Sequence, residues 1–123
     1  MSYETWCEEF YPVSADYCKE EDAIEHSLRK WIGLRIENLD KHELRIVGRS
    51  VRDGNSHTLL IIADRSCSLC RWYASFRCDD CPLAQVLGGR CDVIDAPYDI
   101  WCDTKNPEPM IEALQKAKEL KDA

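Results

Sequence analysis

The sequence predicts a small α+β domain in which a helix, a β-hairpin, a cysteine knuckle and a second helix follow one another along the chain. Three observations support this order. Apolar residues recur at helical spacing before residue 35 and after residue 106, a turn signal separates two strand-like runs between residues 44 and 63, and five cysteines gather between residues 67 and 91. Because 123 residues suffice for one hydrophobic core, we expect residues 1–123 to form a single domain.

The N-terminal part of the chain is predicted to contain an irregular segment followed by helices. Residues 1–18 mix aromatic side chains with Pro12 and are expected to form an irregular arm that lies on the core. From about Lys19 to Leu34 the pattern is helical, and a shorter helix over 37–41 follows. The apolar face of the longer helix carries Ile24, Leu28, Trp31 and Ile32, and its polar face carries Glu21, Asp22, Glu25, Arg29 and Lys30.

The middle and the end of the chain predict a β-hairpin and a final helix. Residues 44–51 alternate weakly, Asp53-Gly54-Asn55 is a turn signature, and residues 58–63 form a short apolar strand. The final helix opens at Asn106-Pro107-Glu108-Pro109, because proline is favoured in the first turn of a helix. Its apolar stripe consists of Met110, Ile111, Leu114, Ala117 and Leu120.

The spacing of the cysteines is the strongest functional signal in the sequence. Cys67-Ser-Leu-Cys70 is followed, after seven residues, by Cys78-Asp-Asp-Cys81-Pro82, and then by Cys91. Two C-x2-C turns can hold one ion between four thiolates, which is the arrangement of many structural zinc sites. We therefore expect residues 67–91 to form a zinc-binding knuckle.

Five cysteines compete for the four positions around one zinc ion, and their spacing leaves two ligand sets open. The first set is Cys67, Cys70, Cys78 and Cys81. In the second set, a helix over 82–87 that ends at Gly88-Gly89 carries ligands at both flanks. That set is Cys67, Cys70, Cys81 and Cys91.

The remaining potential ligands are expected to be structural. Surface positions are predicted for the three histidines, His26, His42 and His57. Each of the other three cysteines has an aromatic neighbour, so we expect buried free thiols that behave as small hydrophobic side chains at Cys7, Cys18 and Cys102.

Two other chemistries could use the same cysteines. An iron–sulfur cluster also takes four thiolates, but charged residues such as Arg71 and Asp79 make these surroundings polar for a cluster. A redox pair of Cys67 and Cys70 would be similar to a thioredoxin-like motif, although no βαβ unit is predicted before it. Phosphate loops, H-E-x-x-H helices and nucleophile elbows are absent from the sequence, which favours a protein that is not an enzyme.

Charge is distributed unevenly along this acidic chain, whose net charge is −7. Residues 1–43 carry five Lys/Arg against eleven Asp/Glu, residues 44–78 carry six Arg against two Asp, and residues 79–123 carry five Lys/Arg against ten Asp/Glu. The acidic flanks favour a protein partner over a nucleic acid. A nucleic-acid interface would use phosphate contacts and stacking, with Arg65, Arg71 and Arg77 beside Trp72 and Tyr73.

The sequence also favours a chain that acts in the cytoplasm and not in a membrane. Its longest apolar run, Leu59–Ala63, is far shorter than a membrane span. The N-terminus is acidic and lacks the apolar segment of a secretory signal, so we expect the cysteines to stay reduced.

Taken together, the cysteine order and the segment Pro97-Tyr98-Asp99-Ile100-Trp101 resemble a group of small bacteriophage and prophage proteins. These proteins share the pattern C-x2-C, C-x2-C-P, C and P-Y-x-x-W. The stretch His26–Arg35 and the Glu37-Asn38-Leu39 that follows are similar to the same group. The resemblance implies a phage origin and the cytoplasm of a host as the setting, and it implies no particular reaction.

Overall fold

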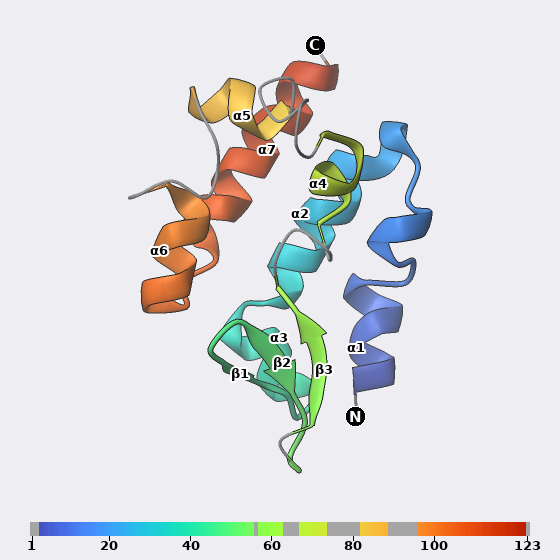
Figure 1. The fold of residues 1–123 in the computed structure, drawn as a ribbon, viewed down its shortest axis with the longest axis vertical. Helices are drawn as coiled ribbons and strands as arrows, with labels where there is room; N and C mark the ends of the chain where they lie inside the picture. Colours follow the sequence, from blue (N-terminus) through green and yellow to red (C-terminus); the bar gives the residue numbers. More distant parts are fainter. Residues whose placement is uncertain (1–2, 56, 63–66, 74–81, 89–95, 123) are drawn as a thin grey trace.

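The computed structural model describes residues 3–55, 57–62, 67–73, 82–88 and 96–122. Helices precede and follow a three-stranded antiparallel sheet, which lies toward one end of the molecule, and this confirms the predicted α+β class (Figure 1). The predicted order of helix, hairpin and final helix is retained, and most of the predicted knuckle over 67–91 lies outside the described residues. Three further helices are present at positions where the sequence pattern did not predict them.

The first of these helices is α1 (Tyr3–Phe10), so the prediction of an irregular arm over 1–18 is wrong for these residues. Tyr3, Trp6 and Phe10 recur at helical spacing, and the latter two are buried. The indole of Trp6 donates a hydrogen bond of 2.9 Å to the carbonyl oxygen of Gly33. A 3₁₀ turn, η1 (Ala15–Tyr17), follows Pro12.

The predicted helix over 19–34 is confirmed as a 3₁₀ turn, η2 (Glu20–Asp22), that leads into α2 (Ala23–Gly33). The predicted short helix is confirmed as α3 (Ile36–Lys41). One side chain of α2 departs from the prediction, because Lys30 is buried with 1% of its surface exposed. Its ammonium lies 5.5 Å from the centre of the Trp31 ring. The buried surface of α2 is therefore broader than its apolar stripe alone predicts.

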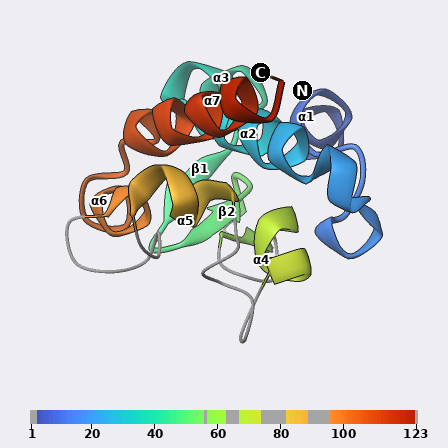
Figure 2. The ribbon, with the colours of Figure 1, turned by 90° about the horizontal axis from the view of Figure 1, so that it is seen from above.

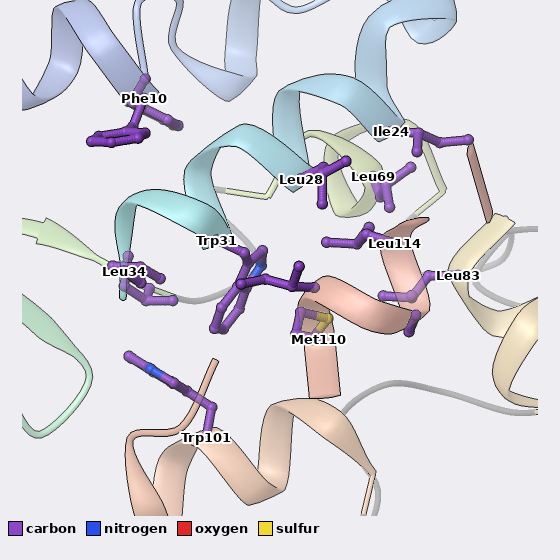
Figure 3. Close-up of a cluster of buried hydrophobic side chains, with 14 of the residues drawn as sticks. Phe10, Ile24, Leu28, Trp31, Leu34, Leu69, Leu83, Trp101, Met110 and Leu114 are labelled. Carbon is purple, nitrogen blue, oxygen red and sulfur yellow. The ribbon is translucent and has the colours of Figure 1, made fainter. Parts of the chain in front are cut away.

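Helix α2 packs against the confirmed final helix, α7 (Glu108–Asp122), and this pair forms the centre of the core (Figure 3). Leu114 and Met110 of α7 lie beside Leu28 and Trp31 of α2. The side chain of Arg35 donates hydrogen bonds of 2.8 and 2.9 Å to the carboxylate of Glu108. This ion pair ties the end of α2 to the start of α7.

Helix α6 (Pro97–Thr104) was not predicted, although Pro97 stands in its first turn as helix starts favour. It contributes Trp101, which is fully buried and meets the Trp31 ring edge to face at 5.2 Å. The hydroxyl of Tyr98 donates to the carbonyl oxygen of Ile62 at 2.5 Å. Through these contacts α6 joins the core to the end of the sheet.

The sheet has three strands, β1 (Arg45–Val47), β2 (Ser50–Arg52) and β3 (Thr58–Ile61), in sequential antiparallel order. The sequence predicts one strand where β1 and β2 stand. Gly48 divides it, because its φ of +61° allows the two-residue turn that pairs Val47 with Ser50. The resulting meander directs the chain from β3 toward the first C-x2-C pair.

Two short helices lie within the predicted knuckle over 67–91 and pack on the α2–α7 pair. Helix α4 (Ser68–Tyr73) contacts α2, and the expected α5 (Pro82–Leu87) contacts α7. Gly88, with φ +75°, follows α5 as a helix end favours. Figure 2 shows that α4, α5 and α6 lie on one side of the α2–α7 pair.

Candidate metal centre

Helix α4 fixes the first C-x2-C pair to the core, since Cys67 directly precedes it and Cys70 lies within it. Leu69 is buried in the main hydrophobic cluster, with 1% of its surface exposed. The buried hydroxyl of Ser68 donates a hydrogen bond of 2.7 Å to the carbonyl oxygen of Ala23 in α2. Trp72 donates from its indole nitrogen to the carbonyl oxygen of Cys18 at 2.9 Å. The position of Cys67 is therefore set by contacts to two other segments.

The side chain of Cys67 is half-buried against α2. Its Sγ lies 3.8 Å from the Oγ of Ser27, which is itself buried. A negative charge on the Cys67 thiolate also acts on the rings of His26 and Tyr11. Burial lowers the pKa of His26 and raises that of Tyr11, and a thiolate at Cys67 shifts both pKa values upward. The thiol of Cys67 thus shares its surroundings with Ser27, His26 and Tyr11.

The structure describes only two of the five cysteines that are predicted as zinc ligands. It describes the side chain of Cys67 and the backbone of Cys70. Cys78, Cys81 and Cys91 lie outside the described residues, as do Arg65 and Arg77 and the side chains of Arg71 and Tyr73 of the alternative interface. Among the residues that are described, no group of three or more His, Cys, Asp or Glu side chains could hold a metal ion. Both ligand sets therefore remain predictions.

The donor chemistry at Cys67 fits zinc. A half-buried thiol at the start of a C-x2-C segment, held on a helical core, is typical of a closed structural site. The chain residues that would hold the ion are Cys67, Cys70 and members of the later cysteines Cys78, Cys81 and Cys91. The ion would supply a cross-link between segments that are distant in sequence.

Cys67 and the other three cysteines with described side chains are free thiols in this structure. Cys18 is buried, whereas Cys7 and Cys102 are half-buried against the core. Burial raises the pKa values of Cys7 and Cys18, which keeps both thiols protonated at neutral pH. These features agree with the expected role as small hydrophobic side chains, most fully for Cys18.

The prediction that all three histidines are surface residues is wrong for His42. This side chain is 1% exposed, and its ring nitrogens lie 2.8 Å from Thr5 Oγ1 and 3.0 Å from Glu9 Oε2. It joins α1 to the end of α3. His57 is exposed and pairs with Asp53 at 3.1 Å, as expected for a surface residue. His26 is half-buried beside Tyr11, with ring centres 5.1 Å apart.

The surface beside α4 combines exposed aromatic side chains with acidic residues. Tyr17 is 82% exposed and Trp72 is 37% exposed, and η1 and α4 contact one another. Next to them lies a cleft of about 490 Å³ between η2, α4, α5 and the end of α7. Ile24 and Leu69 give this cleft an apolar floor, while the exposed Glu20, Glu21 and Lys121 give it a rim with two carboxylates and one ammonium.

Sequence reasoning had no signal for the neighbours of Cys67. Ser27 and His26 are about forty residues away and belong to no motif with the cysteines.

None of the helices in the described ranges is both long and apolar enough to cross a membrane. Comparisons of the chain with protein-family models, curated proteins and solved structures found no match.

Proposed function

We propose that this chain is a non-enzymatic zinc-binding interaction module that engages a protein partner. The observation that carries the proposal is the fixed position of Cys67, whose Sγ lies 3.8 Å from Ser27 on α2 while Ser68 and Leu69 anchor α4. A zinc ion bound by Cys67 and Cys70 would cross-link α4 to the later cysteines. This is the role of a structural ion, because it completes the fold and reacts with nothing.

The proposal places the chain in a reducing compartment, where thiolates remain available to a metal. Its resemblance to small bacteriophage and prophage proteins supports the cytoplasm of a bacterial host as that compartment. In this setting the module would act as a phage accessory protein that binds a host or phage protein.

The surface beside α4 supports a protein as the partner. Tyrosine and tryptophan are enriched in the centres of protein interfaces, and Tyr17 and Trp72 are both exposed here. The neighbouring cleft could accept an apolar side chain on the floor formed by Ile24 and Leu69. The carboxylates of Glu20 and Glu21 would favour basic residues around that side chain.

A nucleic-acid partner is the second candidate, using Arg65, Arg71 and Arg77 with Trp72 and Tyr73. The indole N–H of Trp72 is held by the carbonyl oxygen of Cys18, so it cannot add a phosphate contact to stacking by the ring. The net charge of −7 also opposes phosphate binding, since acids within the screening length of about 8 Å offset the arginine charges. A protein partner is therefore favoured.

A thiol redox function of Cys67 and Cys70 is the third candidate. The strand before this pair belongs to a sheet of three sequential antiparallel strands. A thioredoxin-like site would instead follow a strand of a βαβ unit, and the described residues contain none. We therefore favour a metal-binding role for this pair.

A mobility-shift titration with single- and double-stranded DNA and RNA tests the choice of partner class. The proposal predicts no micromolar binding at about 0.15 M salt. Micromolar binding that is lost when Arg71 and Arg77 are changed to Glu would contradict it.

Affinity capture from host lysate tests whether a protein partner binds at the surface that carries Tyr17 and Trp72. A partner captured by the parent protein should be lost with the Tyr17→Ser/Trp72→Ser double variant. It should be retained by Ile36→Ser, which removes an apolar side chain of α3 that is 72% exposed. Equal capture by all three proteins would contradict the proposed surface.

A further inference from the structure

We propose that the solvent-facing side of the three-stranded sheet binds an acidic segment of a partner protein. Arg45 and Arg52 would be its charged contacts, and Val47 and Ile61 its apolar contacts. This is a second interaction surface, which goes beyond the proposed function because it needs neither the zinc ion nor the surface beside α4. Figure 1 shows the sheet at the end of the molecule that lies away from α5.

The register of the strands separates a core-facing side of the sheet from an open side. Side chains alternate along a strand, and directly opposite residues of an antiparallel pair point to the same side. Val51 pairs with Ile46 and with Leu60, and all three pack in or against the hydrophobic core. The open side therefore carries the other pairs, which are Arg45 with Arg52, Val47 with Ser50, and Ser50 with Ile61.

Two apolar side chains on the open side are in contact with solvent. Val47 is 39% exposed and Ile61 is 51% exposed. Arg45, two residues before Val47 in β1, is exposed as well. Burial of the two apolar side chains against a partner would remove their surface from water, which favours association.

The two arginines form a pair of like charges across β1 and β2. Like charges directly opposite one another destabilise a sheet, so this pair costs stability unless an anion offsets it. Arg52 is half-buried, and its Nε donates a hydrogen bond of 3.1 Å to the Oγ of Ser50. Ser50 donates in turn to the carbonyl oxygen of Val47 at 2.8 Å. The guanidinium of Arg52 is thus held on the open side of the sheet.

Within the described part of the chain, no carboxylate forms an ion pair with Arg52. The acid next to it in sequence, Asp53, is engaged in the β2–β3 turn. Its carboxylate accepts from the backbone N–H groups of Asn55 and His57 and lies 3.1 Å from the Nδ1 of His57. A carboxylate of a partner could therefore bind the Arg52 guanidinium, which favours two parallel hydrogen bonds to such a group.

A protein segment fits the open side better than a nucleic acid does. Single-stranded nucleic acids are bound by basic residues together with aromatic side chains that stack on the bases, and the paired residues of the open side include no aromatic. A phosphate chain that extends beyond the two arginines would also meet the acidic remainder of a chain with net charge −7. A short segment with carboxylates and apolar side chains on one face matches both features of the open side.

Fluorescence anisotropy tests this surface with a fluorescein-labelled peptide of three Glu-Glu-Val-Val repeats. When extended, the peptide presents carboxylates and apolar side chains on each face. We expect it to bind the parent protein, and to bind Arg45→Gln/Arg52→Gln about tenfold more weakly because two exposed charge pairs are lost. Arg45→Lys/Arg52→Lys should retain most of the binding.

Lys19→Gln/Lys116→Gln is the matched control, because it makes the same change in net charge at two exposed lysines outside the sheet. It should bind within about twofold of the parent, since distant charges are screened. Circular dichroism shows whether each variant keeps its fold. Equal losses in the lysine control and the arginine variant would overturn the proposal, and so would parent binding no tighter than that of a Lys-Lys-Val-Val peptide.

Two further measurements separate the other occupants of this surface. A single-stranded thymidine oligonucleotide that binds the parent more tightly than the acidic peptide, and is lost in Arg45→Gln/Arg52→Gln, would assign the open side to a nucleic acid instead. Self-association of the parent in analytical ultracentrifugation that the same variant abolishes would assign it to a second copy of the chain. The proposal predicts neither result.

Discussion

The Oγ of Ser27 lies 3.8 Å from the Sγ of Cys67, forty residues later in the chain. This contact brings α2, the central helix of the core, to the first residue of the C-x2-C segment. It gives the proposed zinc site a rigid support, because α2 is held by α7 and by α1. Substitution of a zinc ligand should therefore lower the free energy of unfolding of the whole domain.

Replacing Cys67 with Ser should destabilise the domain far more than replacing Cys7 with Ser. The first change removes a zinc ligand and should exceed the range of about 0.5–3 kcal/mol seen for most point mutants. The second replaces a half-buried thiol on α1 and should cost less than about 1 kcal/mol. Urea unfolding with zinc present measures both. In chelator the parent and Cys67→Ser should become equal, and similar losses for both variants in zinc would argue against a metal at Cys67.

Alkylation separates the zinc proposal from the redox candidate. Thiolates bound to zinc are shielded from electrophiles, so Cys67 and Cys70 should react with iodoacetamide only after a chelator is added. Mass spectrometry of the labelled peptide gives the rate for each residue. Rapid labelling of Cys67 in the untreated native protein would favour the redox function instead.

Gly33→Ala should destabilise the domain although the position is helical. In an open helix this change would stabilise by about 1 kcal/mol. Here the new Cβ would lie 2.6 Å from the Cβ and Cγ atoms of Phe10, so α1 would have to move. Overpacking of this kind costs about 1–3 kcal/mol.

A double-mutant cycle checks this cause, with unfolding free energy as the measurement. In a Phe10→Gly background, Gly33→Ala should become neutral or stabilising, because both the Cβ and the ring of Phe10 that obstruct it are gone. Equal losses in both backgrounds would assign the effect to something other than the contact of α1 with α2.

Tyr98 should make the domain sensitive to alkaline pH. Burial raises the pKa of Tyr98 to about 12 from its ordinary value of 10.0, so the folded state favours the neutral phenol. Its contribution to stability is complete below pH 10 and is lost as pH rises through about 12.

Tyr98→Phe tests this expectation in thermal melts at pH 7 and pH 11. At pH 7 the variant should lose about 1 kcal/mol, because the hydrogen bond to the Ile62 carbonyl is gone. At pH 11 its deficit relative to the parent should shrink. Tyr17→Phe, at a side chain that is 82% exposed, should match the parent at both pH values. A constant deficit for Tyr98→Phe would contradict the expectation.

Periodicity predicted the helices that carry a continuous apolar stripe, even where other side chains such as Lys30 of α2 are buried beside it. The helices at 23–33 and 108–122 follow this rule, and the short helices at 36–41 and 82–87 were also expected. Helix α1 was not predicted, because acidic residues stand between Tyr3, Trp6 and Phe10 in the sequence and Pro12 follows them. The turn at Gly48 was not predicted, because a single glycine within an alternating run also fits one continuous strand.

The candidate site was predictable only where its residues form a local motif. The spacing of Cys67 and Cys70 is visible in the sequence, and so is the surplus of later cysteines. The contribution of α2 was not, because Ser27 meets Cys67 only through the packing of α4. Burial of Lys30 and His42 likewise depends on tertiary contacts that overrule the usual exposure of charged and polar residues.

Elemental analysis of the purified protein, combined with a thermal melt before and after chelation, tests the central claim most directly. The account predicts about one zinc per chain, together with a sharp fall in melting temperature once the metal is removed, because metal binding and folding are coupled. Protein that contains no zinc, or that carries iron instead, would contradict it.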